Sequence, residues 1–217
     1  MRSTSSTSTA KGFTLLELLI VIAIIAILAT ILVIVINPVE TLRRARDVQR
    51  LSDLSSVRTA IAMYMTVTPN PSLGTCFPAP NAAPGQVYLS KPITGAAVSG
   101  VTYVGSADTT VGNGDGTGLG WIPVDFGGIA GGSPLAALPL DPAQDTTALT
   151  TGTLASTTMV YRYACSNAPL AFEMTARLES IAYGDTAGDQ GGTNKMATDG
   201  GNSTDLYEVG TNLQIID

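Results

Sequence analysis

The longest run of apolar residues in the chain lies close to its N-terminus. Residues 13–36 contain one charged side chain, Glu17, and two threonines among otherwise apolar residues. A helix of this length extends roughly 36 Å, whereas the hydrocarbon core of a bilayer is about 30 Å thick. The run is too long for the apolar region of an ordinary secretory signal, and no small-residue cleavage site follows it. The pattern therefore predicts a membrane-spanning helix that stays in the mature protein.

A second helical pattern follows Asn37 and Pro38. Proline disrupts a helix from within but is favoured in its first turn, so we expect a kink at Pro38, with Asn37 as the cap of a new helix. Over residues 37–67 the apolar positions recur every three or four residues, at Leu42, Val48, Leu51, Leu54, Val57, Ile61 and Met65. This spacing predicts an amphipathic helix whose apolar face packs on a sheet.

The charged residues of this second helix stand at spacings that allow mutual pairing. They are Arg43, Asp47, Arg50 and Asp53. We expect them to form a solvated or subunit-facing side of the helix.

Residues 68–217 show the turn chemistry of a β-rich globular region. Glycine, proline, serine and threonine interrupt short strand candidates at 86–90, 101–104, 159–165, 170–178, 206–209 and 213–216, and a hairpin is expected at 166–169. The predicted fold class is therefore α+β, with one long N-terminal helix and a sheet.

The charge balance limits the classes of function. The net charge is −6, and loss of residues 1–12, which contain Arg2 and Lys11, leaves 9 basic against 17 acidic side chains. Such a surface argues against direct nucleic-acid binding, which needs clustered lysine and arginine. The chain has no histidine, which makes zinc sites and hydrolytic triads improbable.

Glu17 is unusual because an acid inside a membrane span costs a few kcal/mol and normally has a partner, and the span contains no base. Gly12, Phe13, Glu17 and the unbroken apolar run follow a polar, mildly basic segment. This arrangement resembles the class III signal of type IV pilins and type II secretion pseudopilins. The resemblance implies the type IV pilin fold, in which the long helix packs on an antiparallel sheet.

The resemblance also implies a processing and assembly route. A prepilin peptidase would remove residues 1–12 as a leader by cutting between Gly12 and Phe13, and would N-methylate Phe13. Glu17 would then neutralise the N-terminal amine of a neighbouring copy in a helical filament. The expected partners are further copies of the chain, the prepilin peptidase, the inner-membrane assembly platform and the membrane. The precursor would be single-pass with a cytoplasmic N-terminus, and the mature subunit would lie in an extracellular pilus.

Two further features bear on this interpretation. Four arginines (Arg43, Arg44, Arg46 and Arg50) follow the span, which conflicts with a cytoplasmic N-terminus under the positive-inside rule. The motif is the more specific signal, and we follow it.

Residues 138–142, Leu-Pro-Leu-Asp-Pro, resemble an element of major pseudopilins and related pilins.

Cys76 and Cys165 are the only cysteines. In an extracytoplasmic domain a disulfide between them is the natural pairing, and two buried thiols are the alternative.

Four aspartates lie in or beside a glycine-rich loop: Asp185, Asp189, Asp199 and Asp205. Their carboxylate oxygens suit Ca²⁺, and the resemblance to major pseudopilins, which bind calcium in a C-terminal loop, implies the same. Solvated loop acids that bind no metal are the alternative. Ca²⁺ is therefore the single candidate cofactor. The Gly-Asn-Gly-Asp-Gly segment at 112–116 is expected to be a tight turn.

No pair of activated groups suggests catalysis, so we expect a structural protein and not an enzyme. The predicted function is a pilin that polymerises into a type IV pilus-like filament for adhesion, motility or DNA uptake. The alternatives are the major pseudopilin of a type II secretion system and a membrane-tethered binding module that does not polymerise.

Overall fold

The computed structural model describes residues 12–80, 82–94, 101–144, 148–150, 154–184 and 191–216. The chain divides into two compact units, one ending at Thr41 and the other running from Leu42 to Asp217. We call the second unit the head. It contains most of the second helix as well as the sheet, so the amphipathic helix belongs to the same compact body as the β-rich region.

Two helices occupy the N-terminal part of the chain, α1 (Leu15–Ile36) and α2 (Pro38–Val67). Asn37 separates them with a left-handed backbone, φ 45°. Its side-chain oxygen accepts a hydrogen bond from the N–H of Glu40 over 3.3 Å, which caps the start of α2. The interruption therefore falls at Asn37, one residue before the proline at which the sequence predicted a kink.

The head contains a mixed sheet of five strands. Along the chain the strands are β1 (Gly85–Leu89), β3 (Val101–Gly105), β5 (Arg162–Asn167), β6 (Leu170–Ala176) and β7 (Tyr207–Gly210), and their order across the sheet is β3-β1-β5-β6-β7. Two short strands, β2 (Ile93–Thr94) and β4 (Leu149–Thr150), pair separately. The α+β class is thus confirmed, as in the pilin fold.

The expectation of a purely antiparallel sheet is wrong at one edge. Strand β3 runs parallel to β1, whereas β1–β5, β5–β6 and β6–β7 are antiparallel. Parallel neighbours need a long crossover, and the segment between Leu89 and Val101 supplies one. The predicted hairpin at 166–169 is confirmed, because β5 and β6 pair through Asn167 and Leu170.

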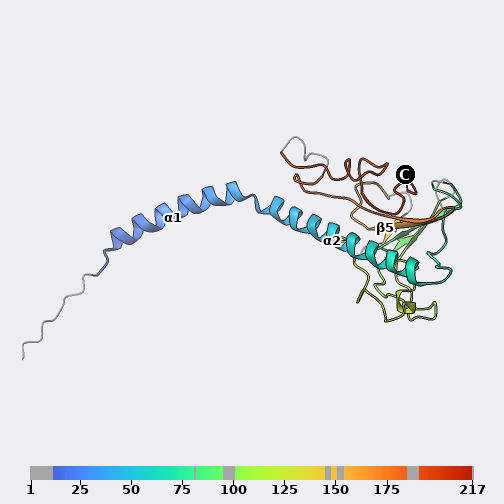
Figure 1. Cartoon of the computed structure of the whole chain (residues 1–217). Coiled ribbons are helices and arrows are strands. Elements are labelled where there is room, and N and C mark those ends of the chain that lie inside the picture. Colours follow the sequence, from blue (N-terminus) through green and yellow to red (C-terminus); the bar gives the residue numbers. More distant parts are fainter. Residues whose placement is uncertain are drawn as a thin grey trace, which may run out of the picture. The chain divides into compact units, whose positions relative to one another are not determined.

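Two apolar clusters cover the two faces of the sheet. On one face, α2 packs against the sheet as predicted (Figure 1); Leu54, Val57 and Ile61 are fully buried with Tyr163 and Phe172. On the other face the C-terminal residues Ile215 and Ile216 join a second cluster with Val87, Leu89 and Ala164. The strands β1, β5 and β6 are therefore buried on both sides, whereas the edge strand β3 exposes Thr102 and Val104.

The C-terminal segment makes no strand, although 213–216 was a strand candidate. The N–H groups of Ile215 and Ile216 donate instead to Oε2 of Glu173, over 2.7 and 3.0 Å. A buried carboxylate thus replaces the backbone carbonyls of a neighbouring strand as the acceptor for this segment.

The long connection between β3 and β5 closes one end of the head. It contains a short 3-10 helix, η1 (Phe126–Gly128), and the Phe126 ring lies edge-on to Tyr64 of α2 at 6.3 Å between ring centres. Asp125 accepts backbone hydrogen bonds from Gly114 and Gly116 over 2.9 and 2.7 Å. The expected tight turn at 112–116 is confirmed.

Candidate functional site

Glu17 closes the first turn of α1 through a capping box with Thr14. The N–H and the hydroxyl of Thr14 both donate to Glu17 Oε2 over 2.9 Å, and the N–H of Glu17 donates to the Thr14 hydroxyl over 3.2 Å. These bonds satisfy backbone donors that a helix start leaves free. Within the part of the chain that the structure describes, Oε1 of Glu17 accepts no hydrogen bond. The carboxylate therefore helps to start its own helix and keeps one oxygen for another donor.

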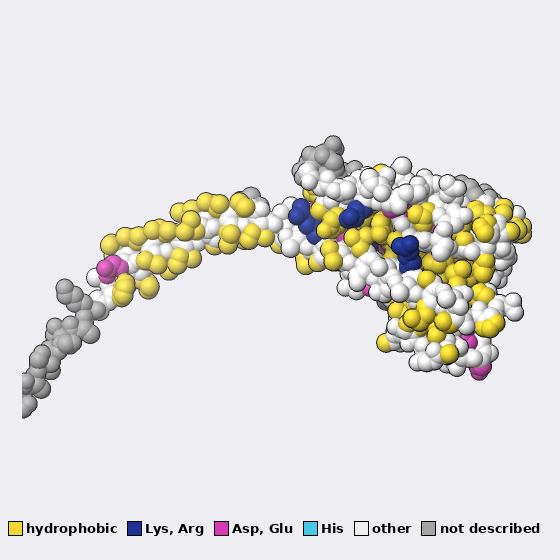
Figure 2. Space-filling model, in the orientation of Figure 1, with side chains coloured by type: hydrophobic (Ala, Val, Ile, Leu, Met, Phe, Trp, Pro, Cys, Tyr) yellow, Lys and Arg dark blue, Asp and Glu magenta, His cyan; other side chains and the backbone are white. Residues whose placement is uncertain are grey.

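The surface of α1 is apolar all the way round and uncovered. The large apolar side chains whose exposure is described are between 48 and 82 % exposed, and Figure 2 shows them along the whole helix, with an acidic group near its start. The stretch Leu15–Val33 is long and apolar enough to cross a membrane. A helix that is apolar on every side needs lipid or other apolar helices around it. The unit thus fits a membrane-anchored precursor.

The predicted processing site lies at the edge of the described chain. Gly12 and Phe13 precede the helix in an exposed, irregular segment, and Phe13 is 85 % exposed. The rest of the predicted leader lies outside the described residues. The bond between Gly12 and Phe13 is thus outside any helix or strand, in a form that a peptidase can reach.

The charged residues of α2 were predicted to face solvent or another subunit. This prediction is wrong for Asp47 and Arg50, which belong to a buried ionic cluster. Arg50 and Asp47 have no exposed surface, and Asp141 is 3 % exposed. The Arg50 guanidinium donates to both oxygens of Asp141 over 2.8 and 2.9 Å, to Asp47 over 2.7 Å and to Glu179 over 2.9 Å. Arg46 donates two further bonds to Glu179. Helical spacing alone could not show that loop residues bury this face.

The cluster connects three parts of the head. Asp141 belongs to the Leu-Pro-Leu-Asp-Pro element, and Glu179 follows β6. Burial lowers the pKa of Arg50, but its hydrogen bonds to Asp141 and the other carboxylates outweigh burial and keep the pKa above its ordinary value. The hydrogen bonds from Arg46 lower the pKa of Glu179 in turn. Arg50 and Glu179 therefore stay charged, and the cluster ties α2 to both loops.

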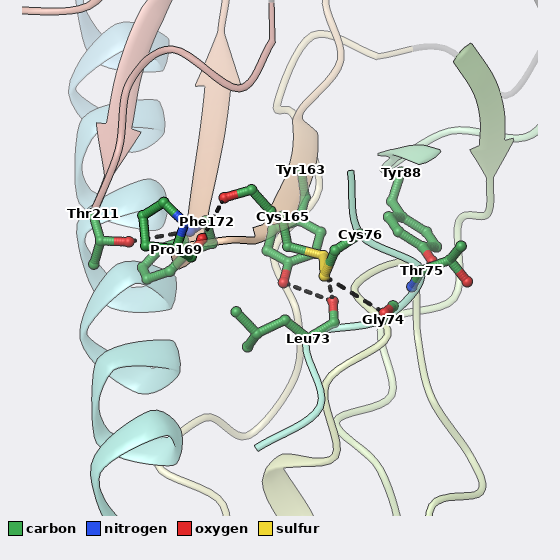
Figure 3. The surroundings of a disulfide bond; sticks show 11 residues. Leu73, Gly74, Thr75, Cys76, Tyr88, Tyr163, Cys165, Pro169, Phe172 and Thr211 are labelled. Atoms are coloured by element: carbon green, nitrogen blue, oxygen red, sulfur yellow. Dashed lines mark hydrogen bonds between the residues drawn. A yellow bond between two sulfur atoms is a disulfide. The ribbon is translucent and has the colours of Figure 1, made fainter. Parts of the chain in front are cut away.

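The two cysteines form a disulfide, as the sequence favoured (Figure 3). Next to it, Phe77 bridges β5: its N–H donates to the Cys165 carbonyl and its carbonyl accepts from the Asn167 N–H, each over 2.8 Å. The Tyr163 hydroxyl donates to the Leu73 carbonyl over 2.9 Å. The bond therefore fixes the segment that follows α2 to the centre of the sheet.

The aspartates predicted to hold calcium are not brought together in the described part of the chain. Asp185 and Asp189 lie outside the described residues. Asp199 accepts backbone hydrogen bonds from Gly201 and Glu208, while Asp205 accepts from the Ser156 hydroxyl and lies 3.8 Å from Arg177. Among the described residues, no group of three or more acidic, histidine or cysteine side chains could hold a metal ion. Calcium binding stays a prediction.

A buried pair of carboxyl groups, Glu173 and Glu208, was not predicted from the sequence. The two are diagonal neighbours on β6 and β7, are 0 and 2 % exposed, and each has an Oε1 atom without a donor among the described residues. Burial raises both pKa values, and the neighbouring Glu173 carboxyl raises that of Glu208 further, to about 9. Glu208 therefore holds a proton at neutral pH. The C-terminal segment covers this face of β6, which the strand pattern alone does not show.

Comparison with known proteins places the N-terminal segment in a family. Residues 7–33 match the model of the prokaryotic N-terminal methylation motif, the class III signal peptide of type IV pilins and pseudopilins. This motif implies processing by a prepilin peptidase and assembly at a membrane. Neither the curated proteins nor the solved structures gave a match. The chain therefore has the class III signal peptide of type IV pilins and pseudopilins at its N-terminus, together with an α+β architecture as in the pilin fold.

Proposed function

We propose that the mature chain, starting at N-methylated Phe13, polymerises through α1 into a type IV pilus-like filament on the cell surface. The observation that carries this proposal is the bare apolar surface of α1, which nothing in the described chain covers. In the bilayer, lipid covers this surface. Outside the bilayer, burial among the α1 helices of other copies is the arrangement that removes it from water.

Glu17 gives this assembly a register. Cleavage after Gly12 creates an amine at Phe13, and this amine needs a counter-ion once it enters an apolar bundle. Glu17 Oε1 is available to the amine of a neighbouring copy, because the capping box uses only Oε2. An ammonium and a carboxylate attract strongly in a low-dielectric core, so the pair favours one stagger between neighbouring helices.

We propose a structural role for the head, without catalytic activity and without direct contact with nucleic acid. Its buried charges are used for internal hydrogen bonds: those of Arg50 join α2 to two loops, and Glu173 holds the C-terminal segment. Adhesion, motility or DNA uptake would then belong to the filament and the machinery that moves it. Calcium bound by the loop that contains Asp185 and Asp189 remains a secondary proposal, and isothermal titration tests it.

The second candidate is the major pseudopilin of a type II secretion system. One observation favours it: the pseudopilin-like Leu-Pro-Leu-Asp-Pro element is a structural part of the head, because its Asp141 holds Arg50 with two hydrogen bonds. A short filament confined to the cell envelope, lost together with secretion of a substrate protein when the chain is deleted, would favour this candidate over a surface pilus.

The experiment that tests polymerisation starts with the N-terminal mass of the chain from cells that make it. We expect a mature chain that begins at N-methylated Phe13. In the same cells, Glu17→Ala should abolish filaments and leave the protein in the membrane, while Thr14→Ala, which removes only the capping hydroxyl, should keep them. An unprocessed chain would indicate the membrane-tethered module instead. The same holds if no filaments form and the Glu17→Ala variant has the same abundance and location as the unmodified chain.

A further inference from the structure

Arg162, the first residue of β5, is a buried cation without a counter-ion among the described residues. Its exposed fraction is 4 %, and its neighbours across the sheet are Leu89 on β1 and Thr175 on β6, neither of which carries a charge. The guanidinium donates from Nη2 to the Ala155 carbonyl over 2.7 Å. Its Nη1 has no acceptor in the part of the chain that the structure describes.

This cation keeps its charge in the interior of the head. Burial lowers the pKa of Arg162, but only to about 10, so the guanidinium is protonated at neutral pH. An unpaired buried charge is costly, and Arg50, which is buried to the same degree, donates to three carboxylates. Arg162 differs from Arg50 in this respect, because the described chain supplies it with no anion.

Arg162 borders a cavity of about 230 Å³. Ser203 borders the same cavity, and its Oγ accepts from the N–H groups of Asp205 and Leu206 over 3.3 and 3.2 Å. A hydroxyl that accepts twice still has its hydrogen to donate. The cavity therefore has two donors suited to an anion, the guanidinium and the Ser203 hydroxyl. The rest of its wall includes an aromatic ring and three aliphatic side chains: Tyr103, Leu154, Leu206 and Ile216.

The acids near this cavity do not neutralise Arg162. Asp205 lies at its rim, where its carboxylate accepts from the Ser156 hydroxyl over 3.1 Å and lies 3.8 Å from Arg177. Glu173 stands on the same face of the sheet, but its Oε2 holds the N–H groups of the C-terminal segment. The carboxylate at the rim repels a doubly charged anion such as phosphate more strongly than a singly charged one.

We propose that the cavity binds a small free carboxylate with an apolar body, held by the guanidinium of Arg162 and the hydroxyl of Ser203. A carboxylate accepts strong, charge-assisted hydrogen bonds from a guanidinium, and the ring and the aliphatic side chains of the wall suit an apolar remainder. The cavity is smaller than the roughly 300–1,000 Å³ of pockets for drug-sized ligands, so the ligand is a small molecule. The site lies within the head and is independent of assembly through α1.

The test is the melting temperature of the full chain in detergent, with sodium benzoate as the probe. Benzoate should raise it by about 2–4 °C at a concentration several-fold above the dissociation constant. Benzamide, which has the same ring and no charge, and sodium phosphate at the same ionic strength are the matched controls. Each of these should shift melting by less than about 1 °C, because the first lacks the anion and the second is doubly charged.

Variants locate the site. Arg162→Met should abolish the benzoate shift and should melt at or above the temperature of the unmodified chain, because it removes an unpaired buried charge. Ser203→Ala should weaken benzoate binding about two- to tenfold, measured by isothermal titration. Arg58→Met, which replaces an exposed arginine on α2, should leave benzoate binding unchanged.

Three results would overturn the proposal. Benzoate binding that persists in Arg162→Met would place the ligand elsewhere. If benzoate does not bind and Arg162→Met melts well below the unmodified chain, Arg162 has a counter-ion of its own; Asp217, which follows Ile216 in the sequence and lies outside the described residues, is then examined with Asp217→Asn. A melting temperature that rises with protein concentration and loses this dependence in Arg162→Met would assign the carboxylate to a second copy.

Discussion

Helices α1 and α2 follow one another along the chain but place their charged residues in opposite ways. In α2, Asp47 and Arg50 are buried and fully engaged with Asp141 and Glu179 from distant loops. In α1, Glu17 is exposed and its hydrogen bonds come from Thr14 alone. The difference teaches which charges find partners within the chain: the head neutralises the Asp47–Arg50 cluster with its own loops, whereas nothing in the described chain covers the apolar surface of α1 or bonds to Oε1 of Glu17.

Removal of the central cation of the head should have the largest effect on stability. Arg50→Met leaves Asp47, Asp141 and Glu179 with no buried counter-ion, so we expect a loss of about 3–5 kcal/mol in the free energy of unfolding. Urea unfolding of the full chain in detergent measures it. Arg58→Met, an exposed arginine on the same helix, is the control and should change stability by less than about 0.5 kcal/mol. Equal effects of the two would show that the cluster does not hold the head together.

Loss of the disulfide should come second. Cys76 and Cys165 are separated by 89 positions, and closing a loop of that size restricts the unfolded chain, so Cys76→Ala with Cys165→Ala should cost about 2–4 kcal/mol. The melting temperature of the head with and without a reductant measures the same difference. The double variant should be insensitive to the reductant, and any remaining sensitivity would contradict the assignment.

The carboxyl pair should give a smaller effect that depends on pH. The pKa of Glu208 is raised from its ordinary value of 4.5 to about 9, so the folded head binds a proton more tightly than the unfolded chain. Its contribution to stability is complete below about pH 4.5 and falls as the pH rises towards 9. Glu208→Gln keeps the shape without the charge and should stabilise the head by about 1–3 kcal/mol near pH 7. The free energy of unfolding of this variant, plotted against pH between 4 and 9, should be flatter than that of the unmodified chain, and an unchanged slope would contradict the raised pKa of Glu208.

Changes in α1 should have the smallest effect on the head. Glu17→Ala removes bonds that are confined to the first turn of α1, so unfolding of the head should shift by less than about 0.5 kcal/mol, even though filaments are lost. A large shift would show that the head depends on α1 and that the two regions are not independent. Leu28→Ala, which lies on the same helix away from Glu17, is the comparison variant.

The sequence predicted those features that follow from local pattern. The apolar run of α1, a helix break within one residue of Pro38, the apolar stripe of α2 and the β5–β6 hairpin depend on residues near each other in the chain. Helical or strand periodicity and turn residues describe such residues well. The signal motif at residues 7–33 is also local, and the family match agrees with it. For the same reason Gly12, Phe13 and Glu17 could be singled out from the sequence alone.

Only the tertiary structure decided which charges are buried. Arg50 meets Asp141 across 91 positions and Glu179 across 129, and β3 joins β1 in parallel through a crossover that no short pattern encodes. Glu173 stands between the core residues Phe172 and Met174 and so lies on the other face of β6, where the C-terminal segment covers it. Local sequence sets the periodicity and breaks of each element, while burial depends on which distant segment packs over a given face, and that is a property of the folded chain as a whole.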